Sequence, residues 1–366
     1  MGAISDADRA YMARALELAA RGMFTATPNP RVGCVLVRDG AIIGEGWHVR
    51  AGEAHAEVAA LADARRRGCD PHGATMYVTL EPCDHHGRTP PCVDAIVAAG
   101  IARVVVALAD PNPDAAGGAA ALAAAGVAVD PGVAENAARE LNIGFVSRMR
   151  RGRPWVRSKI AASLDGRTAL ADGTSQWITG REARADGHAW RARACAVLTG
   201  IGTVLQDDPQ LTVRDVPTTR QPRRVVVDRH GQTPANARIF GDGGAWMVTN
   251  GERNAGWPEG TEVIALPDAQ QRVDLAAMLR ALAERGVNEL HVEAGARLNG
   301  ALLEAGLVDE LLLYVAPAIL GDPARGMFER RLPLAALAVR SRFDWHDVSR
   351  VGADLRILAR RVEETS

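Results

Sequence analysis

The sequence lacks the features of a membrane protein or a general nucleic-acid binder. Its formal net charge is only -1 over 366 residues, which gives no broad attraction for nucleic acid or an anionic bilayer. The longest apolar run, residues 115–129, is too short to cross a bilayer. We therefore expect neither a nucleic-acid partner nor a membrane partner.

Cysteine is scarce, and the few cysteines do not suggest a disulfide framework. The count of five is odd, and we expect Cys34, Cys69 and Cys195 to be structural residues. The first residues carry acids where a signal peptide would have a basic start and an apolar core. We expect a cytoplasmic protein.

The chain is long enough for two hydrophobic cores. It has 366 residues with 47% apolar content, whereas a single core stops growing near about 250–300 residues. Residues 148–154, "RMRRGRP", form a basic break punctuated by glycine and proline, which is typical of a solvated connector. We predict a first domain at 1–147, a linker at 148–154 and a second domain at 155–366.

The densest chemical pattern begins at His55, which stands two residues before Glu57. Cys83 and Cys92 follow, each directly after a proline. One imidazole and two thiolates are three of the four ligands of a tetrahedral zinc, and they leave the fourth position to water, as in a catalytic site. We predict that His55, Cys83 and Cys92 bind zinc.

Glu57 is the predicted catalytic residue. Zinc lowers the pKa of bound water to about 7, and a carboxylate beside it can pass the proton to leaving ammonia. An H-x-E pattern followed by P-C is the signature of zinc deaminases. Here "DHHGRTPP" separates the two cysteines in place of C-x-x-C, and its His85 and Arg88 suit a phosphorylated substrate.

These motifs resemble a known family. "HAEV", "YVTLEPCDHHGRTPPC" and "DPNP" are similar to the deaminase half of the bifunctional deaminase–reductases of riboflavin biosynthesis. "SLDGRTA", "SQWITG", "GTVLQDDPQLTVR" and "VEAGARLNGALL" resemble the reductase half, in the same order. The resemblance covers nearly the whole chain.

The resemblance implies an α/β chain with a cytidine-deaminase-like three-layer domain followed by a dihydrofolate-reductase-like domain. It implies zinc and NADPH as cofactors and a phosphorylated pyrimidine as substrate. The reaction would be hydrolytic deamination of 2,5-diamino-6-ribosylamino-4(3H)-pyrimidinone 5′-phosphate. Reduction of the ribosyl chain to ribityl would then give 5-amino-6-(5-phosphoribitylamino)uracil. We also expect a homo-oligomer.

Two further residues are candidates for binding the deaminase substrate. Asn29 stands between two prolines, and its amide suits the mixed donor and acceptor edge of a pyrimidine, although a turn asparagine is an alternative interpretation. Asp39-Gly40 predicts a hairpin that would deliver His48 to the mouth of the site.

The reductase half has no Gly-x-Gly-x-x-Gly fingerprint, so a standard Rossmann domain is not supported. Instead Glu293 ends a predicted strand, and the backbone N–H groups of residues 295–298 can surround an anion, although such turns are often only structural. By resemblance, the cofactor-binding residues are Ala161, Trp177, Thr203, Asp207, Arg229, Gly295, Ala296, Arg297, Leu298, Asn299, Gly300 and Ala301. The reductase substrate-binding residues are Lys159, Ser175, Arg191, Leu211, Arg214 and Glu293, with Arg191 and Arg214 on the phosphate.

Helix boundaries are predicted from capping residues. A helix over residues 6–21 would be capped by Asp6 or Asp8, and Thr179 with Glu182 would form a capping box for a helix ending near residue 193.

Two other functions stay open. One is a tRNA or nucleotide base deaminase with an unrelated second domain, which lacks support from charge and from C-x-x-C. The other is a scaffold protein with a structural zinc, which an intact Glu57 argues against.

Overall fold

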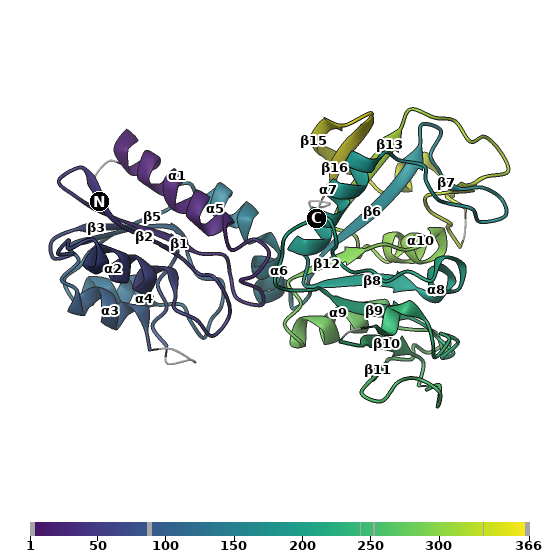
Figure 1. Cartoon of the computed structure of the whole chain (residues 1–366), viewed down its shortest axis with the longest axis horizontal. Helices are drawn as coiled ribbons and strands as arrows, with labels where there is room; N and C mark the ends of the chain where they lie inside the picture. The colour runs from purple at the N-terminus through teal and green to yellow at the C-terminus, as the bar shows by residue number, and fades with distance from the viewer. Residues whose placement is uncertain (1–3, 86–89, 242, 252, 332, 363–366) are drawn as a thin grey trace. The chain divides into compact units, whose positions relative to one another are not determined.

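The computed structural model describes residues 4–85, 90–241, 243–251, 253–331 and 333–362. The chain divides into two compact units, Met1–Gly152 and Arg153–Ser366 (Figure 1). The boundary falls within the predicted linker, but residues 148–151 of that segment are helical and belong to α6, Ile143–Arg151. Within the described ranges, no helix is long and apolar enough to cross a membrane.

The first unit is a three-layer arrangement around a five-stranded sheet with strand order β2-β1-β3-β4-β5. The strands are β1 (Gly33–Arg38), β2 (Ala41–Trp47), β3 (Thr75–Leu80), β4 (Arg103–Leu108) and β5 (Ala128–Pro131). Figure 1 shows two helices, α1 (Asp6–Ala20) and α5 (Glu135–Leu141), on one face of this sheet, and α2 (Ala56–Arg66), α3 (Cys92–Ala98) and α4 (Gly118–Ala124) on the other.

Local sequence explains how α2 is placed. Asp39 and Gly40 both have positive φ, 52° and 76°, and close the predicted hairpin between β1 and β2. Glycine on β2 then lets α2 lie very close to the strand, because a Cβ at Gly46 would come within 2.4 Å of the backbone nitrogen of Ala60. This close packing fixes the start of α2, where His55 and Glu57 stand.

Two predicted caps are wrong. Ser5, rather than Asp6 or Asp8, caps α1, because its hydroxyl accepts from the Asp8 N–H while the Asp8 carboxylate accepts from the Ser5 N–H. The helix α7 (Arg181–Arg193) begins after Gly180, whose position offers no side-chain cap, so Thr179 and Glu182 form no capping box. The Gly180 N–H instead donates to Asp354, a residue distant in sequence.

The second unit is built on a nine-stranded sheet with strand order β11-β10-β9-β8-β12-β6-β13-β16-β15. Every neighbouring pair from β11 at one edge to β13 in this order is parallel. Strand β16 then pairs antiparallel with β13, and β15 pairs antiparallel with β16. The strands of this sheet are β6 (Trp155–Ser163), β8 (Ala196–Gly200), β9 (Arg223–Val227), β10 (Ala245–Thr249), β11 (Glu262–Ala265), β12 (Glu289–Val292), β13 (Glu310–Ala316), β15 (Phe343–Val351) and β16 (Asp354–Arg361). A small separate sheet joins β7 (Arg167–Ala169) and β14 (Arg325–Gly326).

Helices cover both faces of the nine-stranded sheet. On one face, α9 (Leu275–Glu284) and α10 (Ala296–Glu304) pack on the apolar cluster that contains Leu311. The next residue of β13, Leu312, points to the opposite face and packs with Ala183 of α7. The short helix α8 (Ile201–Asp207) follows β8 directly, and single 3-10 turns lie at Arg238–Phe240 and Leu337–Val339.

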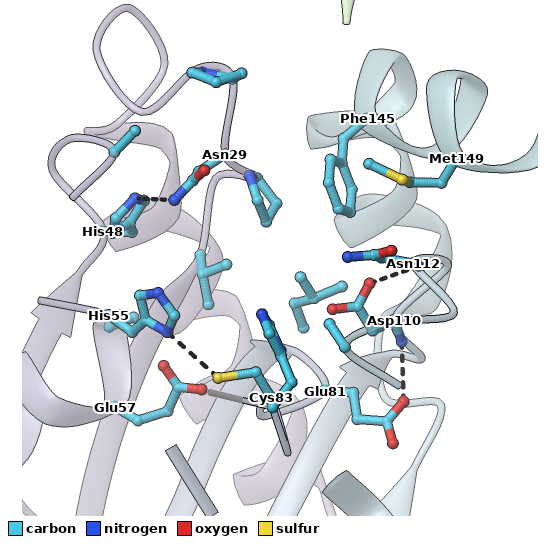
Figure 2. Close-up of a pocket in the computed structure, with 18 of the residues that line it drawn as sticks. Asn29, His48, His55, Glu57, Glu81, Cys83, Asp110, Asn112, Phe145 and Met149 are labelled. Atoms are coloured by element: carbon cyan, nitrogen blue, oxygen red, sulfur yellow. Dashed lines mark hydrogen bonds between the residues drawn. The ribbon is translucent and has the colours of Figure 1, made fainter. Parts of the chain in front are cut away.

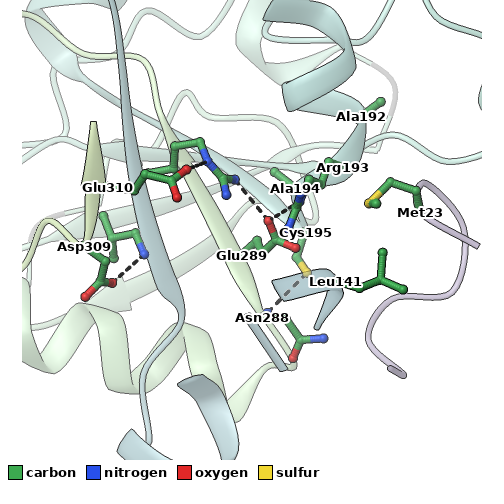
Figure 3. Close-up of polar contacts among 12 residues, drawn as sticks. Met23, Leu141, Ala192, Arg193, Ala194, Cys195, Asn288, Glu289, Asp309 and Glu310 are labelled. Carbon is green, nitrogen blue, oxygen red and sulfur yellow. Dashed lines mark hydrogen bonds and ion pairs between the residues drawn. The ribbon is translucent and has the colours of Figure 1, made fainter. Parts of the chain in front are cut away.

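A network of buried charges joins the strands beneath α7. Arg157 of β6 contacts Glu289 of β12 at 3.0 Å and also contacts Glu310 of β13. Arg193 of α7 contacts Glu289 at 2.7 Å (Figure 3). Arg360 of β16 contacts Glu310 at 3.0 Å. Since buried charges are tolerated only when paired, this network fixes the register of β6, β12 and β13.

Candidate functional site

Three metal-binding side chains converge at one edge of the first unit. His55 is the N-cap residue of α2, Cys83 follows β3, and Cys92 is the first residue of α3. The His55 Nδ1 atom lies 3.2 Å from the Cys92 Sγ and 3.5 Å from the Cys83 Sγ. All three ligand atoms lie within 4.8 Å of one another, as a single metal ion requires. Figure 2 shows two of the three side chains, His55 and Cys83.

The chemistry of these donors fits zinc. Hydrogen bonds from Cys92 and His55 lower the pKa of Cys83 to about 4, whereas the hydrogen bond to Cys83 raises the pKa of Cys92. The two sulfurs therefore share one proton, which a divalent cation would displace. Two thiolates and one imidazole are a zinc donor set with one coordination position left.

Glu57 lies beside this trio in the first turn of α2 and is only 4% exposed. Burial raises the pKa of its carboxyl to about 7. A carboxyl with a pKa near neutrality can both accept and release a proton during a reaction, which is the property of a general acid–base. Figure 2 shows Glu57 directly below His55 and next to Cys83.

His55, Cys83 and Glu57 line a cavity of about 570 Å³. Asn29 and His48 line it on one side, and the Asn29 Nδ2 atom lies 3.1 Å from the His48 Nε2 (Figure 2). The His48 Nδ1 lies 3.1 Å from the carbonyl oxygen of Ala54. Burial lowers the pKa of His48 below its ordinary value, which favours the neutral ring.

The opposite side of the cavity carries residues that the sequence analysis did not select. Asp110 and Asn112 line it on the loop after β4. Glu81 holds this loop, because its carboxylate accepts from the Asp110 N–H at 3.0 Å and from the Ala119 N–H at 2.9 Å. Burial raises the pKa of Asp110 to about 6. The available signal was the "DPNP" motif, since β3 and β4 are parallel neighbours that end at the same edge of the sheet.

A third wall of the cavity comes from α6. Phe145, Arg148 and Met149 line the cavity from this helix, and Figure 2 shows Phe145 and Met149 across the cavity from His55. His85 also lines the cavity, and its buried Nδ1 has no hydrogen-bond partner among the described residues. The predicted phosphate-binding residue Arg88 lies outside the described residues.

The second unit contains a separate cavity of about 940 Å³. Predicted reductase residues that line it are Lys159, Ala161, Ser175, Thr203, Asp207, Glu293, Gly295, Ala296, Arg297 and Leu298. Predicted residues that are not among its lining are Trp177, Arg191, Leu211, Arg214, Arg229, Asn299, Gly300 and Ala301. The second cavity is also lined by Thr168, Gly173, Arg325 and Glu329, which are not among the predicted residues.

A charged cluster surrounds Glu293, which lines the second cavity. Arg191 of α7 donates to both carboxylate oxygens of Glu293, at 2.7 and 2.9 Å, and to the carbonyl of Thr212 at 2.6 Å. Burial opposes ionisation of Glu293, but Arg191, His291 and Lys159 together bring its pKa well below the ordinary value. Burial lowers the pKa of Lys159. The Arg191 guanidinium is thus held by Glu293, whereas the sequence analysis had placed it on a substrate phosphate.

Two adjacent strand ends form the other wall of the second cavity. β8 and β12 are parallel neighbours, and each is followed by a helix, α8 or α10. A Cβ at Gly295 would lie 3.9 Å from the Thr203 Oγ1, so the two turns are in contact. Helix α10 begins directly after Gly295 and directs free N–H groups toward the cavity, which favours an anionic group there.

Two protein families match this chain, one within each structural unit. Residues 5–108 match the family described as the cytidine and deoxycytidylate deaminase zinc-binding region. Residues 154–355 match the RibD C-terminal domain. The Riboflavin biosynthesis protein RibD of Escherichia coli is 49% identical over 95% of this chain and 98% of its own length. RibD of Aquifex aeolicus is 40% identical over 98% of this chain and 99% of its own length.

Solved structures of similar proteins share the whole fold. RibD of Acinetobacter baumannii, form 1, has a TM-score of 0.90 at 43% identity and covers 98% of this chain and 99% of its own. A diaminohydroxyphosphoribosylaminopyrimidine deaminase/5-amino-6-(5-phosphoribosylamino)uracil reductase of Thermotoga maritima has a TM-score of 0.89 at 36% identity, covering 97% of this chain and 99% of its own. These matches confirm the predicted α/β fold class of the chain.

Proposed function

The chain belongs to the RibD family of riboflavin biosynthesis proteins, and on that premise we propose which residues carry its two reactions. It is a bifunctional deaminase and reductase with a zinc-binding deaminase domain and an NADPH-dependent reductase domain. The proposed substrate is 2,5-diamino-6-ribosylamino-4(3H)-pyrimidinone 5′-phosphate, which loses its 2-amino group before its ribosyl chain is reduced to ribityl.

The arrangement of Glu57 beside His55, Cys83 and Cys92 carries the proposal for the first reaction. His55, Cys83 and Glu57 line a cavity large enough for a small heterocycle, and Cys92 lies beside them in the cluster of metal-ligand atoms. When bound there, zinc would supply the lowered pKa of water, about 7, that hydrolysis at neutral pH requires. His55, Cys83 and Cys92 hold the metal, and Glu57 moves the proton.

Protein groups around the cavity divide the remaining work. The buried Glu57 carboxyl accepts a proton at one oxygen and releases it to the departing amine, because burial brings its pKa to about 7. Asn29 and Asp110 face the cavity from opposite sides and present hydrogen-bonding groups to the pyrimidine edge. Phe145 and Met149 cover the side across from His55 and help to exclude water.

The second cavity is the proposed site of reduction. NADPH would supply the hydride, and its pyrophosphate fits the turn at the start of α10. Lys159 and Glu293 face the cavity from neighbouring strands and would orient the ribosyl hydroxyl groups. Arg191 holds the Glu293 carboxylate in place through two hydrogen bonds.

The setting of the enzyme is also a proposal. All five cysteines are free, which suits the reducing cytoplasm. The net charge of -1 supports a small-molecule substrate without a nucleic-acid partner. Strand β15 is an edge of the large sheet and exposes Trp345 (72%) and Val348 (55%), which supports assembly into a homo-oligomer.

The test follows both reactions in one sample. Zinc-loaded protein should release one ammonia per pyrimidine phosphate without NADPH, and added NADPH should then be consumed in equal amount. Protein stripped of zinc should release no ammonia but should still oxidise NADPH with the pre-deaminated substrate. Ammonia release that does not depend on zinc, or NADPH consumption without a ribosyl substrate, would contradict the proposal.

A further inference from the structure

His48 lines the deaminase cavity, but its polar atoms are already occupied by the protein. The residue is only 2% exposed. Its Nδ1 lies 3.1 Å from the Ala54 carbonyl oxygen, and its Nε2 lies 3.1 Å from the Asn29 amide nitrogen. A neutral imidazole has two polar atoms, and both are used here. His48 therefore has no ring nitrogen left for a substrate.

The Ala54 contact determines which ring nitrogen carries the proton. A backbone carbonyl only accepts hydrogen bonds, so the His48 Nδ1 must be the N–H donor. The neutral ring then has a bare lone pair at Nε2, which can only accept. The group of Asn29 that faces Nε2 must therefore be its NH₂ group, and the amide cannot be turned the other way without placing two acceptors together.

The same contact determines what Asn29 offers to the cavity. With its NH₂ group bonded to His48, its carbonyl oxygen lies on the other side of the amide, as Figure 2 shows. Asn29 lines the cavity together with Pro28 and Pro30, which flank it in the chain. An asparagine could otherwise turn either its oxygen or its NH₂ group away from His48. Here the oxygen is turned away from His48, and one N–H of the NH₂ group is used by His48.

We propose that His48 is a positioning residue for deamination, which acts by fixing the Asn29 amide with its oxygen toward the substrate. The proposal rests on the deaminase function proposed above. An acceptor at this place selects a ring that has an N–H group beside the carbon that loses its amine. A 4(3H)-pyrimidinone has such an N–H, whereas the corresponding ring nitrogen of cytosine is bare. The relay from Ala54 through His48 to Asn29 thus determines specificity at the ring.

The test is a double-mutant cycle on deamination of the pyrimidine phosphate. His48→Leu should lower kcat/KM by a factor on the order of 10 to 100, since a buried group is left without its partner. Asn29→Ala should lower it by a similar factor. The double variant should fall within about 2-fold of Asn29→Ala alone, because His48 has no route to the substrate other than Asn29.

Asn112 provides the matched control. It lines the same cavity on the side across from His48, as Figure 2 shows. The losses of kcat/KM from Asn112→Ala and His48→Leu should therefore multiply in the double variant.

A conservative replacement should restore function in part, because the amide oxygen of His48→Gln can accept from the Asn29 NH₂ group. His48→Gln should keep several-fold more activity than His48→Leu.

Two measurements distinguish the possible failures. Zinc content shows whether the metal site survives, and NADPH oxidation with pre-deaminated substrate shows that the reductase unit of each variant is unchanged. If the losses of kcat/KM from His48→Leu and Asn29→Ala multiplied in the double variant, the inference would be overturned. Loss of zinc from both His48 variants would also overturn it, because His48 would then support the metal site. If the unaltered chain itself releases no ammonia, the proposed function fails instead.

Discussion

Glu57 is the residue on which the deaminase chemistry depends most directly. Replacing Glu57 by Gln keeps the shape and the hydrogen-bonding capacity of the side chain but removes its ability to carry a proton. We expect zinc to be retained while the rate of ammonia release falls by a factor on the order of 10² to 10⁴. Single-turnover ammonia release, normalised to bound zinc, measures this change.

Cys83→Ser is the comparison that separates proton transfer from metal binding. A serine hydroxyl is a poor zinc ligand beside a thiolate, so this variant should lose zinc together with ammonia release. Metal analysis of both variants decides the roles. If Glu57→Gln lost zinc as Cys83→Ser does, or released ammonia at a normal rate, Glu57 would not be the proton carrier.

Residues of the deaminase site differ in how far they could be predicted from the sequence. His55 stands two residues before Glu57, and Cys83 and Cys92 each follow a proline, a pattern typical of a zinc deaminase site. The structure brings these side chains together. Asp110 and Asn112 were missed because no spacing links them to His55. Parallel pairing of β3 and β4 places their loop beside Cys83, and the pattern of a single strand does not reveal that pairing.

At the scale of elements, α6 changes the interpretation of the connector. Residues 148–154 have the composition of a linker, but residues up to Arg151 continue α6, whose Arg148 and Met149 line the deaminase cavity. The Arg148 guanidinium also lies 5.9 Å from the centre of the Phe145 ring, which holds it on the cavity wall. A cation at this wall suits the phosphate end of a substrate whose amine is held at the opposite side.

Arg148→Ala should therefore raise the KM of deamination by about 10-fold, the loss expected for one charged hydrogen bond. Zinc content and NADPH oxidation should not change. Arg150 is the matched control, because it is an exposed arginine of the same helix that is not among the cavity-lining residues. Arg150→Ala should change KM by less than about 2-fold. Equal effects of the two variants would mean that α6 contributes only general positive charge.

Elements with strong local signals were predicted, and those fixed by distant contacts were not. The Asp39-Gly40 hairpin follows from turn chemistry. Helix α5 was missed because its N-cap residue is Ala134, which has a left-handed φ of 59° and no capping side chain. Helix α7 begins where Asp354 accepts from Gly180, a contact that the local sequence does not reveal.

At the scale of the whole molecule, each cavity is lined by residues of a single unit. The deaminase cavity uses residues up to Met149, and the reductase cavity begins at Lys159, on either side of the boundary after Gly152. No described residue lines both cavities. The two predicted domains therefore keep separate chemistry, and α6 belongs with the first unit.

This separation predicts that the two reactions can be lost independently and recombined. Glu57→Gln should abolish ammonia release and spare NADPH oxidation, and Glu293→Gln, which keeps the size of the side chain that Arg191 binds, should do the reverse. Because the two sites share no lining residue, their coupling energy should be near zero. A mixture of the two variants should therefore convert the pyrimidine phosphate to the ribityl product through free intermediate.

The decisive measurement supplies pre-deaminated substrate to Glu57→Gln and follows NADPH absorbance. If folded, zinc-loaded Glu57→Gln did not oxidise NADPH, the state of the deaminase site would control the reductase, and the two units would have to be treated as one catalytic body.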